Sequence, residues 1–236
     1  MEKELKALVE KLKAAAGANL QAVVLYGSAA AGDYQANHSD LNVLCLLGRA
    51  GAAELESLHP VVEWWARRGF RLPLLFTFEE LRRSADVFSI ELLDMKRHHR
   101  MLLGEDFLSQ LDVPMTLHRQ QIERELRTNW VRLRQGIVLA PRKRSALLGL
   151  MTASVSSFAA LFRHALIALG EPVPDGKRAV IERIAQLSGA GATPFLTVLD
   201  IREGRQKESQ VDAVATLRGY LELVERFTDE VDRRLG

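Results

Sequence analysis

Cysteine is nearly absent from this sequence: Cys45 is its one cysteine among 236 residues. A single cysteine excludes a disulfide within the chain, which suits a reducing compartment. Cys45 lies in an apolar run, so we interpret it as inert packing in a strand rather than as a reactive thiol.

Long apolar runs and a strong net charge are lacking as well. One long uncharged and largely apolar stretch, residues 145–162, contains several Ser and Thr and falls short of the roughly 20 apolar residues that a membrane span needs. Residues 1–6 are charged and lack the apolar core of a signal peptide. The net charge of +2 gives no argument for nucleic acid as a partner. We therefore expect a cytoplasmic protein with neither a membrane nor a nucleic acid as partner.

The spacing of apolar residues changes along the chain. Up to about Val113, short apolar runs alternate with helical patterns, and beyond it only helical spacing occurs. This predicts an α+β domain over residues 1–113, a mixed sheet flanked by helices. An all-α helical bundle follows over residues 114–236, with Pro114 at the boundary.

Apolar runs and turn residues place the individual elements. In the first domain we expect strands over residues 20–25, 41–47, 70–78 and 97–103, and helices over residues 3–15, 52–68 and 86–94. In the second we expect helices over residues 117–139, 144–169, 177–187, 194–202 and 211–235.

A short motif joins the first two strands. Gly27 and Ser28 follow the first strand directly, and eleven residues separate Ser28 from Asp40, which enters the second strand. Glycine lets the backbone approach a ligand, and serine beside exposed N–H groups can bind a phosphate. Because side chains alternate along a strand, Asp40 and Asn42 are expected on one face, with Leu41 and Val43 on the other. Two oxygen-bearing side chains beside a phosphate-binding turn suit a Mg²⁺-nucleotide site.

The order of strand, Gly-Ser, spacer and polar-x-polar strand resembles the nucleotidyltransferase superfamily of DNA polymerase beta and kanamycin nucleotidyltransferase. The resemblance implies that Gly27 and Ser28 bind the phosphates of a nucleoside triphosphate. It also implies that Asp40 is catalytic and that Asp40 and the residue at position 42 bind the metal. The alternative is an ordinary strand-to-helix turn followed by a polar turn.

Two departures from the family pattern bear on activity. Asn42 stands where the second aspartate belongs, and the strand ending near Thr77 has no third carboxylate. Asn42 contributes a dipole but no charge, and the third carboxylate is the expected general base. We expect Mg²⁺ to bind weakly, or only together with a nucleotide.

Three functions follow from this pattern. The first is a nucleotidyltransferase-fold protein, degenerate at the metal site, that binds a nucleotide or a partner. The second is an active Mg²⁺-dependent nucleotidyltransferase that moves a nucleoside monophosphate to a small molecule or protein, with Glu79, Glu91 or Asp94 as replacement acids. The third is a toxin–antitoxin-like unit. The absence of the second aspartate and of the third carboxylate favours the first of these functions.

The helical half resembles HEPN-like domains, whose ribonuclease members have an arginine and a histidine about four residues apart. No such pair occurs here, and we interpret His118 and His164 as isolated histidines. Residues 119–144 carry eight basic and two acidic side chains, a net +6. Arg124, Arg127 and Arg134 can share one helix face, which either binds an anion or is simply solvated.

Overall fold

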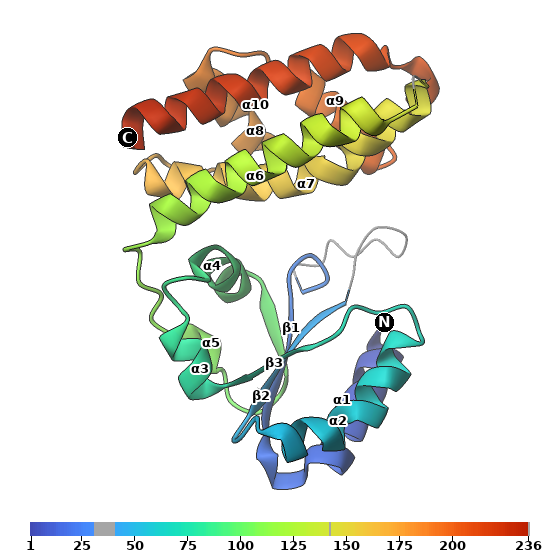
Figure 1. Ribbon diagram of the computed structural model, residues 1–236, viewed down its shortest axis with the longest axis vertical. Helices are drawn as coiled ribbons and strands as arrows, with labels where there is room; N and C mark the ends of the chain where they lie inside the picture. Colours follow the sequence, from blue (N-terminus) through green and yellow to red (C-terminus); the bar gives the residue numbers. More distant parts are fainter. Residues whose placement is uncertain (31–40, 142, 236) are drawn as a thin grey trace. The chain divides into compact units, whose positions relative to one another are not determined.

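The chain divides into two compact units, Met1–Met115 and Thr116–Gly236 (Figure 1). The computed structural model describes residues 1–30, 41–141 and 143–235. The first unit combines a sheet with helices, whereas the described residues of the second contain helices and no strand. The predicted fold class, an α+β domain followed by a helical bundle, is confirmed.

Among the described residues of the first unit, four strands form a sheet in the order β3-β2-β1-β4. Their bounds are β1 Leu20–Tyr26, β2 Asn42–Leu47, β3 Leu74–Thr77 and β4 His99–Leu103. β1 pairs antiparallel with both β2 and β4, and β2 pairs parallel with β3, so the sheet is mixed. The predicted strand 97–103 is confirmed as an edge strand.

Helices cover both faces of this sheet (Figure 1). One face packs against α1 (Glu2–Ala16) and α2 (Ala52–Ala66), and the other against α3 (Phe78–Arg83), α4 (Ser89–Arg97) and α5 (Phe107–Gln110). Leu41 and Val43 belong to the first core, and Leu44 and Leu46 to the second. This alternation assigns Asn42 to the face of Leu44 and Leu46.

The third strand, Leu74–Thr77, is shorter than the predicted range 70–78: it begins four residues later and ends one residue earlier, where helix α3 begins. Thr77 is the N-cap of α3: its Oγ1 accepts a hydrogen bond from the Glu80 N–H at 3.2 Å, and the Glu80 carboxylate accepts one from the Thr77 N–H at 2.8 Å. Such a capping box satisfies backbone donors that a strand would leave exposed at this edge. The helix predicted over residues 86–94 also lies later, at Ser89–Arg97.

The described residues of the second unit form five α-helices, close to the predicted ranges. They are α6 His118–Leu139, α7 Arg144–Ala168, α8 Lys177–Ser188, α9 Thr193–Arg202 and α10 Ala213–Leu235. Helix α7 packs against all four others. It is the one helix in the described part of the chain that is long and apolar enough to cross a membrane. Ten of its residues are buried within the protein, so packing in the bundle accounts for its composition.

Aromatic rings fill the centre of the bundle. Phe195 and Tyr220 stack with their ring centroids 3.7 Å apart, and Phe158 packs edge-on against both. The Tyr220 hydroxyl is 2.9 Å from the Ser154 hydroxyl, which satisfies the buried polar group.

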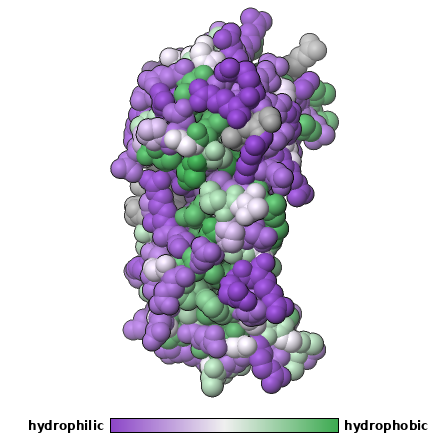
Figure 2. Space-filling view, turned by 90° about the vertical axis from the view of Figure 1, so that its left-hand side faces the viewer, coloured by the Kyte–Doolittle hydropathy of each residue, from purple (hydrophilic) through white to green (hydrophobic). Residues whose placement is uncertain are grey.

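On the face drawn in Figure 2, hydrophilic residues predominate and hydrophobic residues form smaller areas between them.

The two histidines of the bundle are not isolated, so that interpretation was wrong. His118 on α6 and His164 on α7 are buried, and their rings meet edge-on with centroids 5.2 Å apart. The two positions lie 46 residues apart in sequence, so spacing alone gave no sign of the pair. The packing of α6 along α7 brings them together.

Candidate nucleotide site

A tight turn follows β1. The Gly27 N–H donates to the His98 carbonyl at 3.0 Å, and the Gly27 carbonyl accepts from the Ala30 N–H at 3.0 Å. Gly27 has φ +78°, a left-handed conformation that glycine adopts at little cost. Ser28 is half-buried in this turn, and its hydroxyl makes no hydrogen bond to the described residues. The predicted phosphate-binding turn therefore exists as a turn, with a serine hydroxyl available in it.

Asn42 lies against this turn. It is the first residue of β2 and pairs with Tyr26, the last residue of β1. Its Nδ2 is 3.3 Å from the position that a Cβ on Gly27 would take. Its Oδ1 is buried and has no hydrogen-bond partner among the described residues. The structure thus brings together Gly27, Ser28 and Asn42, whereas Asp40, the predicted catalytic and metal-binding residue, lies outside the described residues.

Two charged residues, Arg71 and Glu91, act on Tyr26, the strand partner of Asn42, and sequence reasoning missed both Tyr26 and Arg71. Burial is the main cause that raises the pKa of Tyr26; the Arg71 charge lowers that pKa and the Glu91 charge raises it. Both charges therefore lie close enough to act on the Tyr26 hydroxyl. The feature of the sequence that could have identified Tyr26 is its position directly before the Gly-Ser turn.

Arg71 reaches the neighbourhood of Asn42 because of the parallel pairing. Leu74 lies opposite Leu44, so the segment that leads into β3 lies beside the start of β2. The Arg71 carbonyl accepts a hydrogen bond from the Trp65 indole at 2.9 Å, which fixes the backbone there. Its exposed guanidinium makes no ion pair within the described chain. Sequence reasoning placed a strand over Arg71 and searched it only for acids.

The same register separates Glu79 from the site. Thr77 lies opposite Leu47, at the other end of β2 from Asn42, and five residues of strand span about 16 Å. Glu79 pairs with Arg82 and Arg83, at 3.1 and 2.7 Å, and those hydrogen bonds lower the pKa of its carboxyl. Of the acids considered as replacements, Glu79 is therefore not brought to the site, whereas Glu91 acts on Tyr26.

A metal ion finds few ligands in the described part of this site. No group of three His, Cys, Asp or Glu residues that could hold a metal occurs in residues 1–30, 41–141 and 143–235. Asn42 Oδ1 supplies one neutral oxygen, whereas Mg²⁺ prefers several hard oxygens, carboxylates among them. The described residues therefore do not fit a metal held by protein ligands alone.

No protein-family model matches the sequence. No curated protein matches it either. Among solved structures, the chain is similar to the spectinomycin adenyltransferase of Enterococcus faecialis, whose crystal structure was determined with ATP and spectinomycin. The two share 15% identity, the match covers 95% of this chain and 98% of that one, and the TM-score is 0.59. The chain therefore has the nucleotidyltransferase fold of the kanamycin nucleotidyltransferase type, an α+β domain followed by a helical region.

Proposed function

We propose that this protein binds a nucleotide through the turn after β1 and does not transfer the nucleoside monophosphate. The observation that supports this most directly is the charge of the site. Neutral Asn42 stands at the metal position, and the Arg71 cation lies nearby. A site for two metal ions needs negative charge at that place, whereas a site for phosphate needs positive charge or N–H donors.

Nucleotidyl transfer requires neutralisation of the α-phosphate, an in-line nucleophile and stabilisation of the pyrophosphate that leaves. Asn42 adds no charge toward that neutralisation, and β3 has no carboxylate to accept the proton of an attacking hydroxyl. Asp40 is the remaining acid of the predicted motif. One carboxylate is too little to assemble a catalytic metal pair.

The proposed binding mode uses groups that remain. Backbone N–H groups around Gly27 and the Ser28 hydroxyl would donate to phosphate oxygens, and Arg71 would supply positive charge. Mg²⁺ would enter already bound to the nucleotide, with Asp40 and Asn42 Oδ1 as its protein ligands, and would neutralise phosphate charge.

The likeness of the bundle to HEPN domains stays a prediction. The free, buried Cys45 suits a reducing compartment, and we propose the cytoplasm.

A second function, active nucleotidyl transfer, is favoured by one observation. Glu91 acts on the hydroxyl of Tyr26, the residue opposite Asn42. An acid so placed could replace the missing general base and assist metal binding. The structural neighbour was crystallised with ATP and a small molecule, which suggests a small acceptor for this alternative.

A thermal-shift screen tests the proposal. The protein is melted with each of the four ribonucleoside triphosphates, with Mg²⁺ and with EDTA. Ligand at about 100 times its Kd stabilises the native state by about 2.7 kcal/mol, so binding raises the melting temperature clearly. We expect at least one nucleotide to stabilise the wild type and Ser28→Ala to weaken that effect. No stabilisation by any nucleotide would contradict nucleotide binding, and pyrophosphate release that Glu91→Gln abolishes would establish the second function instead.

A further inference from the structure

Helix α6 ends in apolar side chains that face solvent. Val138 and Leu139 are 85% and 83% exposed, and Val131, about two turns earlier on the same helix, is 48% exposed. Nearby, Val214 at the start of α10 is 52% exposed. Removal of such apolar surface from water favours binding of a partner that covers it. We call this region the α6 end patch, defined by Val131, Val138, Leu139 and Val214.

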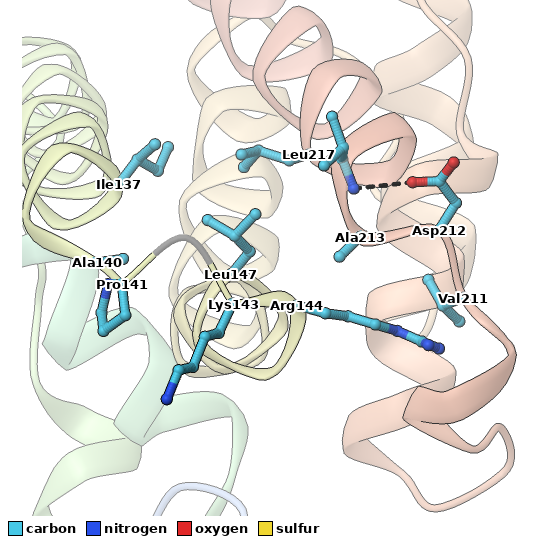
Figure 3. A pocket seen from close by; sticks show the side chains of 11 residues that line it. Ile137, Ala140, Pro141, Lys143, Arg144, Leu147, Val211, Asp212, Ala213 and Leu217 are labelled. Carbon is cyan, nitrogen blue, oxygen red and sulfur yellow. Dashed lines mark hydrogen bonds between the residues drawn. The ribbon is translucent and has the colours of Figure 1, made fainter.

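Two hollows adjoin the patch within the second unit. One, of about 560 Å³, lies between the end of α6 and the starts of α7 and α10 (Figure 3). Ile137, Leu147 and Leu217, one from each of these helices, line it together with Val214. The other, of about 700 Å³, lies along α6 beside Val131, Val138 and Leu139. The apolar side chains therefore border hollows that can receive side chains of another molecule.

The rim of the patch is basic. Lys143 and Arg144 line the first hollow, and Arg134 lines the second, with its guanidinium 5.1 Å from the centre of the Trp130 ring. The acid of the first hollow, Asp212, is already engaged, because its carboxylate accepts from the Val214 and Ala215 N–H groups at 3.0 Å each and caps α10. With three cationic side chains and one carboxylate along the two hollows, the rim carries a net positive charge.

We propose that the α6 end patch binds an acidic amphipathic α-helix of a partner protein. Apolar side chains on one face of that helix would enter the two hollows, and carboxylates along its flanks would meet Arg134, Lys143 and Arg144. A second copy of this chain fits poorly, since the segment 119–144 carries a net +6 and two such faces would repel. Val131 to Leu139 spans about 12 Å of helix, enough to contact roughly two turns of the partner.

A designed peptide provides the probe. An 18-residue fluorescein-labelled peptide with leucines at helical i, i+3, i+4 and i+7 positions and glutamates elsewhere is titrated with the full chain, and fluorescence anisotropy is measured. We expect saturable binding that weakens at least tenfold in the double variant Val138→Ser/Leu139→Ser and in Lys143→Gln/Arg144→Gln. Because Val138 and Leu139 are exposed, the first variant should keep the wild-type melting temperature. Leu55→Ser, at an exposed apolar position of α2 in the other unit, is the matched control and should bind normally.

Three results would overturn the proposal. The first is no saturable binding of the glutamate peptide up to millimolar protein, or equal binding of a peptide with lysine at every glutamate position. The second is binding to phosphatidylglycerol vesicles that Val138→Ser/Leu139→Ser abolishes, which would assign the patch to an anionic membrane. The third is wild-type dimerisation in sedimentation velocity that the same variant abolishes, which would assign it to a second copy.

Discussion

Replacing Gly27 by alanine tests the turn after β1, and Gly69 offers a matched control. Both glycines have nearly the same left-handed conformation, with φ +78° and +81°. A Cβ on Gly27 would lie 3.3 Å from Asn42 Nδ2, whereas a Cβ on Gly69 would meet nothing within 4 Å. The two alanine variants therefore share the backbone strain, and Gly27→Ala alone also disturbs the candidate site.

The size of the shared effect follows from the backbone. An L-residue in the left-handed region costs about 1–2 kcal/mol. The first unit has 115 residues, and at about 2.1 cal/mol/K per residue its unfolding entropy is about 0.24 kcal/mol/K. Each kcal/mol then lowers the melting temperature of this unit by about 4 °C. We expect both variants to melt about 4–8 °C below the wild type. Gly27→Ala should show the larger drop, because Asn42 must also move.

The nucleotide response separates the two variants. With the triphosphate that stabilises the wild type, Gly69→Ala should show the full rise in melting temperature, and Gly27→Ala little or none. Differential scanning calorimetry measures both quantities in one series. An undiminished nucleotide response in Gly27→Ala would refute the role of this turn, whatever its effect on stability.

Three further predictions concern Arg71, His118 and Cys45. Arg71→Gln should weaken nucleotide binding about tenfold, the size of one lost charge-assisted contact, as isothermal titration calorimetry can measure; unchanged affinity would remove Arg71 from the site. Burial, and then the charge of His164, lowers the pKa of His118 from 6.5 to about 4. Below about pH 6.5 the unfolded chain therefore binds a proton at His118, whereas the folded chain stays unprotonated there down to about pH 4. The free energy of unfolding should thus fall as the pH drops from about 6.5 to 4. His118→Gln should reduce this fall in the free energy of unfolding, as urea unfolding at a series of pH values can measure. An unaltered pH dependence would contradict the assignment of the effect to His118. Burial raises the pKa of Cys45 to about 12, so iodoacetamide at pH 8 should label it only after unfolding, and rapid labelling of the native protein would contradict its burial.

The helical half was the more predictable part of the fold. Turn residues such as Pro141 and the pair Pro172 and Pro174 separate long apolar stripes, and helical spacing depends on local sequence alone. The predicted helices agree with α6 to α10 within one or two residues at each end. The pairing of His118 with His164 was not predictable in this way, because it depends on the contact between two helices.

The site was predictable only where one short segment contains it. Gly27 and Ser28 directly follow one strand, and Asn42 begins the neighbouring strand. The Gly-Ser motif and the alternation of side chains along a strand were therefore enough to predict these three as site residues. Arg71 and Glu91 approach Tyr26 through the order and register of strands and through helix packing, which a sequence pattern does not encode. The capping box at Thr77 and Glu80 ends β3 one residue before the predicted end, because local side-chain hydrogen bonds compete with the strand.

The central claim is that this fold retains the nucleotide turn but has lost the charge that holds metal. Asn42→Asp tests it most directly, because the change adds one negative charge with almost no change in volume. Without metal, the new carboxylate and Asp40 should repel, so the melting temperature near neutral pH should fall. With Mn²⁺, two carboxylates can share the ion, and the loss should be recovered. The measurement is the Mn²⁺-induced rise in melting temperature of Asn42→Asp beside that of the wild type: the account predicts a clearly larger rise in the variant, and equal rises would contradict it.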